Sequence, residues 1–401
     1  MTDQLLSFDD ALAKLLGFVR PLRDTEEVDT MQADGRVLAA AQFSTIDQPP
    51  MDNSAMDGYA LRMADFGGAG SRFKVSQRIA AGDVGQALAP HTVARIFTGA
   101  PLPPGADTVV MQEAVDVDGD EVIIQATPRA GEWVRRRGED VAAGDELLPA
   151  GHRLTPQALA LAASTGLARL PVFRRMRVAV FSTGSELVMP GEPLPPGGIY
   201  NSNRFVLRAL LARLGCEVAD FGIIPDRLDA TREAFRRAAG ANDLILTSGG
   251  VSVGEEDHVK PAVEAEGSLD LWKIAMKPGK PLAYGRVGES AFIGLPGNPV
   301  SSFVTFLLMV RPFVLATQGA GFAHNAGRLL PAAFDWPKPD RRREFLRARI
   351  NETGEVELFS RQGSAAIQST VWANALVDVL PGQTITRGER VRVLPYAELM
   401  D

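Results

Sequence analysis

The stretch Leu244-Ile-Leu-Thr-Ser-Gly-Gly250 decides the fold prediction, because it has the pattern of a buried strand that runs into a tight turn. A second stretch, Val178-Ala-Val-Phe-Ser-Thr-Gly184, has the same form. In an open parallel sheet, ligands bind beyond the carboxyl ends of the strands, where glycine turns leave backbone N–H groups accessible to a phosphate. Either stretch alone is equally typical of a simple strand-to-helix turn. Their pairing on one sheet favours a binding site.

Around these two stretches, residues 175–322 alternate between apolar strands and amphipathic helices. The alternation predicts a doubly wound, mostly parallel α/β sheet. We expect strands near residues 177–181, 217–218, 243–246, 271–274 and 291–294, and helices over residues 203–214, 229–239, 257–266 and 299–317. The last helix carries the longest apolar run, which Arg311 and Pro312 interrupt. That run is too short for a membrane span, so we expect a buried helix.

The first 174 residues do not show this regular alternation of strands and helices. Ser7 and Asp10 resemble a capping box before an amphipathic helix, and a second helix is expected over residues 30–40. After Gln48-Pro-Pro50, short strands near residues 94–98, 108–111 and 121–124 alternate with turn residues. A helical pattern returns after residue 140, with Thr155-Pro156 as a helix start. We therefore predict a split helical domain, residues 1–45 plus 140–174, around an inserted β domain, residues 46–139.

Residues 323–401 lose the helical pattern. Period-two alternation in residues 345–350, 355–359 and 390–393 predicts a C-terminal β-barrel. The chain is accordingly predicted to be a multidomain α/β protein with four domains. Its length of 401 residues agrees, since one hydrophobic core rarely extends over so long a chain.

Composition disfavours several classes of protein. The formal net charge of -7 argues against a nucleic-acid surface. The single cysteine, Cys216, excludes an intramolecular disulfide and a thiolate-rich zinc or iron–sulfur site, and the four histidines lack metal-ligand spacing. The N-terminus has no basic segment followed by an apolar core. We therefore expect a cytoplasmic protein without nucleic-acid or membrane partners.

Charged candidates for a site follow the predicted strand ends. Glu186 and Asp257 come after the two glycine turns and could hold a hard divalent cation, although such acids are more often solvated or capping residues. Lys273, Lys277 and Lys280 could hold an oxyanion, or could belong to a basic surface loop. The residues alone leave both alternatives open.

The glycine turns and a third segment could bind a substrate phosphate. Leu295-Pro-Gly-Asn-Pro299 is predicted to start a helix, with Asn298 as its N-cap, and a helix start exposes backbone N–H groups. The candidates for this role are Ser182, Thr183, Gly184, Thr247, Ser248, Gly249, Gly250, Pro296, Gly297 and Asn298.

Five segments occur together and in order. They are Met51-Asp-Asn-Ser-Ala-Met-Asp57-Gly-Tyr-Ala60, Phe97-Thr-Gly-Ala-Pro-Leu-Pro-Pro-Gly-Ala-Asp-Thr-Val-Val110, Thr247-Ser-Gly-Gly-Val-Ser-Val-Gly-Glu-Glu-Asp257, Lys277-Pro-Gly-Lys280 and Leu295-Pro-Gly-Asn-Pro-Val-Ser301. In this combination the chain resembles the molybdopterin molybdenumtransferase family, that is, MoeA and the E domain of gephyrin. Each segment is moderately specific, their ordered co-occurrence is highly specific, and the resemblance covers nearly the whole chain. One departure is Ser185, where the family usually has Asp.

The resemblance implies a molybdopterin-binding α/β domain and a homodimer with a shared active site. The β domain of one subunit, carrying Asp57 and Thr98, would face the α/β domain of the other. The family's catalytic residues correspond to Asp57, Thr98, Glu186, Asp226, Asp257, Lys273, Lys277, Arg347 and Ser364, the last two by weaker local matches. Among them, the metal ligands would be Glu186, Asp226 and Asp257.

The resemblance also implies an activity, the insertion of molybdenum from molybdate into adenylylated molybdopterin, with Mg²⁺ and release of AMP. The dithiolene of the substrate would supply the sulfur ligands, which agrees with a protein that has a single cysteine. Two other functions stay open: a scaffold for dimerisation and peptide binding, and a related pterin-domain enzyme that cleaves a different pyrophosphate. Tungstate could replace molybdate.

Overall fold

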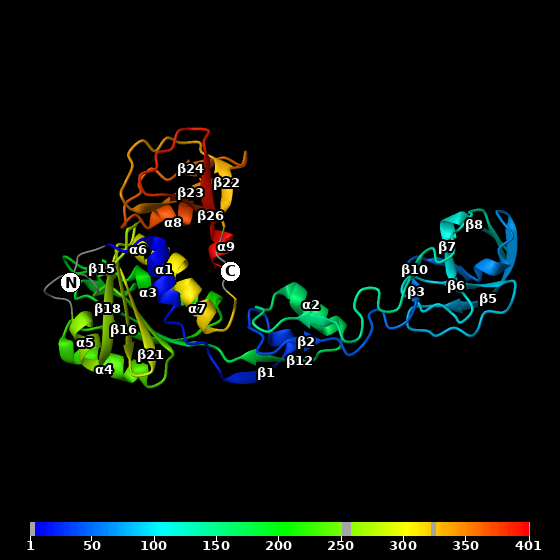
Figure 1. Ribbon diagram of the computed structural model, residues 1–401, viewed down its shortest axis with the longest axis horizontal. Coiled ribbons are helices and arrows are strands. Elements are labelled where there is room, and N and C mark those ends of the chain that lie inside the picture. The colour runs from blue at the N-terminus through cyan, green and yellow to red at the C-terminus, as the bar shows by residue number, and fades with distance from the viewer. Residues whose placement is uncertain (1–4, 251–257, 322–325, 401) are drawn as a thin grey trace.

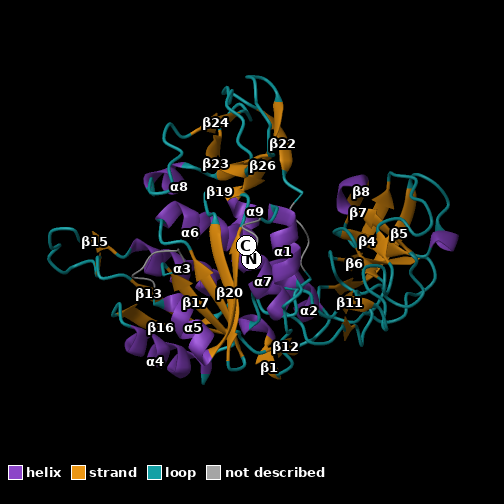
Figure 2. Cartoon of the chain, turned by 60° about the vertical axis from the view of Figure 1, so that its left-hand side comes forward, coloured by secondary structure: helices purple, strands orange, loops and turns teal. Residues whose placement is uncertain are grey.

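The protein is described here by a computed structural model that covers residues 5–250, 258–321 and 326–400 and has an elongated shape (Figure 1). An α/β domain and a small barrel lie together at one end. A β domain lies at the other end, and a narrow segment connects the two. Figure 2 shows the same separation from a second direction.

The α/β domain is built on a six-stranded sheet with the order β16-β13-β17-β21-β20-β18. The first four strands are parallel, and β20 pairs antiparallel with both of its neighbours. The mostly parallel sheet is thus confirmed. The strands are β13 (Arg177–Thr183), β16 (Glu217–Ile224), β17 (Leu244–Ser248), β18 (Gly267–Lys273), β20 (Pro281–Val287) and β21 (Ser290–Leu295).

Helices cover both faces of this sheet, because alternate strand residues point to opposite sides. Ala179 and Phe181 pack with α4 (Leu228–Ala239) and α5 (Val259–Glu266), whereas Val178 and Val180 pack with α3 (Ser202–Arg213) and the helix that follows β21. The expected helices at these positions are confirmed. Both faces are apolar, which is the arrangement of a doubly wound sheet.

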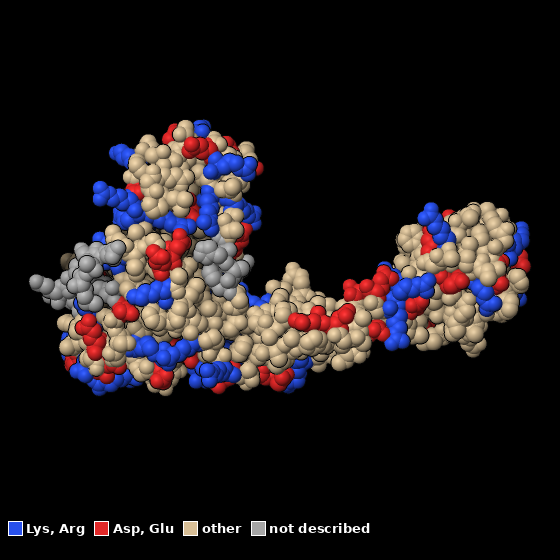
Figure 3. Space-filling model, viewed as in Figure 1, with Lys and Arg blue, Asp and Glu red and all other residues tan. Residues whose placement is uncertain are grey.

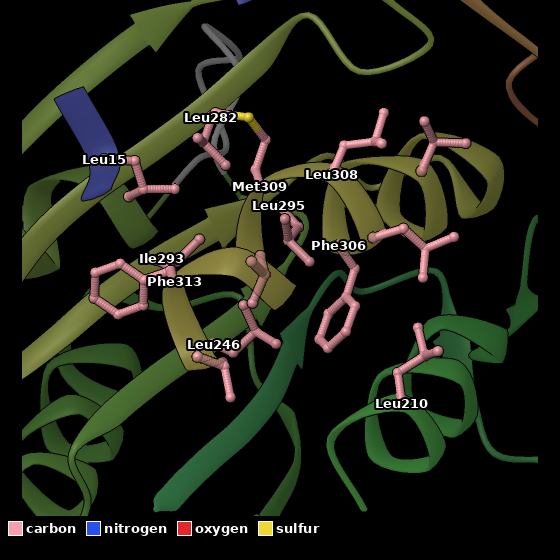
Figure 4. Close-up of a cluster of buried hydrophobic side chains, with 14 of the residues drawn as sticks. Leu15, Leu210, Leu246, Leu282, Ile293, Leu295, Phe306, Leu308, Met309 and Phe313 are labelled. Carbon is pink, nitrogen blue, oxygen red and sulfur yellow. The ribbon is translucent and has the colours of Figure 1, made fainter. Parts of the chain in front are cut away.

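The helix after β21 is the centre of the core. It runs through α6 (Pro299–Thr305), a π-helical turn (Phe306–Val310, labelled η4) and α7 (Arg311–Thr317). Figure 4 shows its apolar side chains packed against Leu246, Ile293 and Leu295 of the sheet. Among the described residues, Pro299–Thr317 is the one helix that is long and apolar enough to span a membrane. However, 83% of its most apolar 18-residue stretch is buried inside the protein. It is a core helix, as expected.

The N-terminal helix α1 (Phe8–Leu16) packs on the same core, and Ser7 caps it by accepting a hydrogen bond from the Asp10 amide. The predicted helix over residues 30–40 is wrong. Only a 3₁₀ turn, η1 (Thr30–Gln32), forms there, and Val37 and Leu38 make isolated β-bridges instead. The reason is local, since Gly35 has φ of +69°, a conformation that ends a helix.

The connecting segment contains one α-helix, α2 (Pro156–Ser164), and short paired strands. Thr155 caps α2 by accepting from the Ala158 amide, as the sequence predicted. Strand β1 (Thr25–Asp29) pairs with β12 (Arg169–Phe173), and β2 (Gln42–Phe43) pairs with β11 (Glu146–Leu148). These pairings join the two sequence pieces on either side of the β domain.

The β domain is a six-stranded sheet with the order β7-β4-β6-β5-β9-β8. The strands expected near residues 94–98, 108–111 and 121–124 are present. The elements are β4 (Gly58–Leu61), η2 (Met63–Asp65), β5 (Ser71–Ile79), β6 (Thr92–Ile96), β7 (Thr108–Met111), η3 (Gln112–Ala114), β8 (Val115–Asp118) and β9 (Glu121–Ile124), with β3 (Asn53–Ser54) paired to β10 (Val134–Arg135).

The C-terminal barrel has the strand order β19-β23-β25-β26-β22, with β24 also paired to β23. A bridge between Ala332, which follows β22, and Val356 of β24 closes the ring around an apolar core. Strand β19 (Met276–Lys277) leaves the α/β domain to pair with β23. The other elements are β22 (Arg328–Pro331), β23 (Arg343–Ile350), β24 (Val356–Leu358), α8 (Gln368–Trp372), β25 (Ala375–Val379), β26 (Arg390–Pro395) and α9 (Tyr396–Met400). The residue boundaries of the four domains remain a prediction.

Candidate active site

A cleft of about 1060 Å³ runs along the edge of the α/β sheet at which the parallel strands end. Its lining follows the order of the strands. Asp226 comes after β16, Glu186 after β13, Gly249 and Gly250 after β17, and Pro296–Asn298 after β21. Because β20 is antiparallel, its beginning lies at the same edge, so the residues from Lys277 to Pro281 complete the row. The cleft therefore has carboxylates at one end, glycine turns in the middle and cations at the other end.

The glycine turns in the middle require glycine. Gly249 and Gly250 have φ of +89° and +70°. A Cβ at Gly250 would lie 2.3 Å from Cγ2 of Val259 and 2.8 Å from Oγ1 of Thr183. The Gly249 amide donates to the carbonyl of Leu295 at 3.0 Å, which fixes this turn beside the Pro296–Asn298 segment. The close approach of backbone to backbone leaves room for an anionic ligand above it.

Two carboxylates, Glu186 and Asp226, line one end of the cleft. A Cβ at Gly184 would lie 2.6 Å from Oε2 of Glu186, so the missing side chain of Gly184 makes room for this carboxylate. Neither carboxylate forms an ion pair with another residue that the structure describes. Both are therefore available to a cation.

Basic side chains occupy the other end, where the barrel meets the α/β domain. Lys277 and Lys280 line the cleft from the α/β domain, and Arg342 lines it from the barrel. Lys277 Nζ lies 2.6 Å from Oε1 of Glu344. The guanidinium of Arg342 donates two hydrogen bonds to the carboxylate of Asp340, and these bonds hold the pKa of Asp340 far below its ordinary value. Figure 3 shows Lys and Arg side chains gathered at this junction. Such a set suits a tetrahedral oxyanion.

The barrel contributes a loop, residues 362–365, that reaches the cleft. The carbonyl of Ser364 accepts the Val300 amide in the first turn of α6 at 3.0 Å, which ties the loop to the α/β domain. Arg347 braces the loop from behind, because its Nη2 donates to the carbonyl of Gly363 and its amide donates to Gln362. Burial of Arg347 lowers the pKa of its guanidinium to about 10.

Comparison with known proteins agrees with these features along the whole chain. Family models match residues 6–166 (MoeA N-terminal region, domain I and II), residues 179–316 (probable molybdopterin binding domain) and residues 330–396 (MoeA C-terminal region, domain IV). The molybdopterin molybdenumtransferase of Haemophilus influenzae is 39% identical over 99% of this chain and 100% of its own. The chain belongs to the molybdopterin molybdenumtransferase family.

Other relatives agree. The molybdopterin molybdenumtransferase 2 of Mycobacterium tuberculosis is 38% identical over 92% of this chain and 93% of its own. The crystal structure of the molybdopterin biosynthesis MoeA protein from Pyrococcus horikoshii has a TM-score of 0.84 at 29% identity, covering 98% of this chain and 100% of that one. The predicted family and the multidomain α/β fold class are confirmed. A role as a transferase in molybdenum cofactor biosynthesis is confirmed with them.

The structure gathers most of the predicted site residues of this molybdenumtransferase in the cleft. Those that line it are Thr183, Gly184, Glu186, Asp226, Ser248, Gly249, Gly250, Lys277, Pro296, Gly297, Asn298 and Ser364. Ser182 and Thr247 lie behind it, both fully buried, and the Ser182 hydroxyl is hydrogen-bonded to that of Ser248 at 3.0 Å. Lys273 ends β18 without lining the cleft, and Arg347 is fully buried. Asp257 lies outside the described residues.

Asp57 and Thr98 lie in the β domain, far from the cleft of the same chain (Figure 1). The amide and the hydroxyl of Thr98 both donate to Oδ1 of Asp57 at 2.8 Å. These bonds, led by the one from the amide, hold the pKa of the Asp57 carboxyl below its ordinary value. The pair is a preformed anionic group at the exposed end of the molecule. One chain alone does not bring it to the cleft.

The cleft also contains residues that were not predicted from the sequence. Asn201 and Asn203 begin α3, and Nδ2 of Asn203 donates to the carbonyl of Gly297 at 2.8 Å. Arg342 comes from the barrel. The segment Asn201-Ser-Asn203, two asparagines directly before a predicted helix, carried a usable signal. Arg342 carried no such signal. It is one of three consecutive arginines, and the sequence does not show which of them lines a cleft.

Metal binding rests on fewer residues than the sequence suggested. Within residues 5–250, 258–321 and 326–400, no group of three or more His, Cys, Asp or Glu side chains is arranged to hold a metal ion. Glu186 and Asp226 share the cleft, and Asp257, the third ligand that the resemblance implies, is not described. The metal set Glu186, Asp226 and Asp257 therefore remains a prediction.

Proposed function

We propose that this molybdenumtransferase takes adenylylated molybdopterin and molybdate as substrates, inserts molybdenum into the dithiolene and releases AMP. The observation that supports this most directly is the order of charges along the cleft. A single row of strand ends offers carboxylates, glycine turns and cations in sequence. That order matches a substrate with a phosphoanhydride in its middle and an oxyanion beside it.

The cations at the barrel junction would hold molybdate. Lys277, Lys280 and Arg342 supply N–H donors from two domains, and the loop of Ser364 lies beside them. Fixed donors in a cleft stabilise an oxyanion without reorganisation at the moment of reaction. The dithiolene sulfurs belong to the substrate, so the protein needs no thiolate of its own, in agreement with its single cysteine.

Mg²⁺ is the proposed cation at the carboxylate end. Glu186 and Asp226 fit it, because carboxylate oxygens are its preferred protein ligands and both groups are free of ion pairs with described residues. Asp257 would complete the set. When bound, Mg²⁺ would neutralise charge on the phosphates. The residues of the chain itself would position the phosphoanhydride on the glycine turns of Gly249 and Gly297.

We further propose that the protein acts as a homodimer in the cytoplasm. Asp57 and Thr98, which the family resemblance assigns to the site, lie at the far end of the same chain. A second copy could bring this pair to the cleft of its partner. In a symmetric dimer, each chain would contribute its β domain to the cleft of the other chain. A shared site would therefore account for the elongated shape.

The assay combines the purified protein with adenylylated molybdopterin, Mg²⁺ and molybdate and follows AMP release and active-cofactor formation. We expect AMP release that depends on molybdate, and loss of turnover in Asp226→Asn while the fold is retained by circular dichroism. Well-folded wild-type protein that releases no AMP in response to molybdate would contradict the proposed function and favour the scaffold alternative.

A further inference from the structure

Two arginines of the β domain lie beside the pair of Asp57 and Thr98, and the proposed function leaves both unused. Arg78 of β5 and Arg95 of β6 occupy paired positions on neighbouring strands. Their guanidinium groups lie 4.5 and 4.6 Å from the ring centre of Phe97, which directly precedes Thr98. Within the part of the chain that the structure describes, Arg95 alone of the two also makes hydrogen bonds. The two arginines therefore differ in what they can hold in place.

The hydrogen bonds of Arg95 go to the segment that carries Asp57. Its Nη1 donates to the carbonyl of Gly58 at 2.9 Å, and its Nη2 donates to Oε1 of Gln112 at 2.6 Å. Gln112 in turn donates its amide to the carbonyl of Asp57 at 3.1 Å. One guanidinium thus fixes two successive carbonyl groups, that of Gly58 directly and that of Asp57 through Gln112.

The same guanidinium contacts an aromatic ring next to each member of the pair. It lies 5.2 Å from the ring centre of Tyr59, two residues after Asp57, and also contacts Phe97. Tyr59 is buried, so its ring is held by packing. A planar guanidinium can stack on rings while its N–H groups donate in fixed directions, which a lysine ammonium cannot do. Arg95 therefore connects the start of β4, where Asp57 lies, to the end of β6, where Thr98 lies.

The backbone and the charge around Asp57 act in the same direction. A Cβ at Gly58 would lie 1.9 Å from the carbonyl oxygen of Val110, so the chain directly after Asp57 is pressed against β7. The bonds from the amide and then the hydroxyl of Thr98 lower the pKa of Asp57, and the positive charge of Arg95 lowers it further. The carboxylate is thus kept ionised and held from several sides.

We propose that Arg95 is a positioning residue for the reaction, which fixes the orientation of the Asp57 carboxylate that one chain presents to the cleft of its partner. This inference rests on the proposed function. Arg95 acts on Asp57 through Gly58, Gln112 and the neighbouring rings, without contacting the substrate. A displaced carboxylate slows the reaction even when the substrate is bound normally. Loss of the Arg95 bonds should therefore lower kcat and leave the KM for adenylylated molybdopterin unchanged.

The variants Arg95→Lys and Arg78→Lys form a matched pair, because both keep the charge beside Phe97 and only the first loses directed hydrogen bonds. Arg95→Lys should lower kcat about tenfold or more, whereas Arg78→Lys should keep it within about twofold. Gln112→Ala, at an exposed position, removes the acceptor of Nη2 and should lower kcat about threefold. Urea denaturation verifies that all three variants fold. Unchanged kcat in Arg95→Lys, or a raised KM with unchanged kcat, would overturn the inference.

Amide hydrogen exchange gives a readout that does not depend on turnover. The amides of Thr98 and Gln112 both donate to Asp57, so each should exchange about fivefold faster in Arg95→Lys and at the wild-type rate in Arg78→Lys. If the wild type turns over while Arg95→Lys changes neither kcat nor exchange, the positioning role is wrong and the proposed function stands. If the wild type shows no turnover but exchange becomes faster in Arg95→Lys alone, Arg95 still orients Asp57 and the proposed reaction fails.

Discussion

At the scale of single residues, the site depends on positions at which only glycine fits. Gly250 can turn the chain below the cleft only because nothing occupies the space between Val259 and Thr183. A Gly-Gly pair after a strand is visible in the sequence, so this part of the site could be predicted. The same was true of Glu186, which follows the other glycine turn.

Gly250→Ala is expected to reduce turnover more than tenfold, because its Cβ would clash with Val259 at 2.3 Å and its φ of +70° is strained for alanine. Gly119→Ala is the control, since Gly119 has φ of +66° with nothing within 4 Å of the added Cβ. Steady-state kinetics of both variants would separate the clash from backbone strain. Equal activity of the two variants would show that the space at Gly250 does not matter.

Thr98 lowers the pKa of Asp57. Because hydrogen bonds lower the pKa of this carboxyl, they stabilise the fold at pH values above the ordinary pKa of aspartate, and the stabilisation is lost as the pH falls towards the lowered value. Thr98→Val removes one of the two bonds and should raise the pKa of Asp57, whereas Thr98→Ser should not. An NMR titration of the Asp57 carboxyl measures this. An unchanged pKa in Thr98→Val would mean that the hydroxyl bond is not formed in solution.

At the scale of elements, Arg343 holds two strands of the barrel together through a buried ion pair and connects the barrel to α1 through a second, partly exposed one. Arg343 of β23 makes two bonds to Asp378 of β25, at 2.6 and 2.7 Å, and also bonds Asp9 of α1 at 2.9 Å. The side chain of Asp378 is fully buried. Since Met276 and Lys277 of β19 pair with Arg343 and Glu344 of β23, these contacts lie next to the cation end of the cleft.

Asp378→Asn should lower the free energy of unfolding by about 3 kcal/mol, because it leaves the charge of a buried arginine without its main partner. Asp118→Asn removes the exposed pair with Arg72 and should cost less than about 1 kcal/mol. Urea denaturation of both variants gives the comparison. A loss at Asp378 no larger than that at Asp118 would contradict a stabilising role for this buried pair of the barrel.

Elements with a regular pattern could be predicted from the sequence, and those set by distant partners could not. The helix that contains Pro299–Thr317 and the parallel strands β13, β17 and β21 carry long apolar signals of their own, whereas β16 was predicted only at residues 217–218. Residues 30–40 looked helical, but Gly35 and pairing with residues 153 and 172 made them a turn and bridges. Strand β20 was not predicted, since Pro281 at its start and Gly285 within it weaken the pattern. Arg342 enters the cleft only through the folding of the barrel.

At the scale of the whole molecule, the shape separates residues that the family resemblance assigns to one site. The cleft lies between the α/β domain and the barrel, and Asp57 with Thr98 lies beyond the connecting segment (Figure 1). Our central claim is that two chains share each active site. It predicts that a mixed dimer has one intact site when one subunit carries a defect in its β domain and the other subunit carries a defect in its cleft.

The most direct measurement mixes two inactive variants, Asp57→Asn and Glu186→Gln, under conditions in which subunits exchange. A shared site predicts that random mixing restores about a quarter of wild-type turnover, because half of the dimers then contain one intact site out of two. The control mixes Glu186→Gln with Asp226→Asn, two cleft residues of the same chain, and should restore nothing. Restoration in neither mixture, with exchange verified by mass, would contradict the shared site.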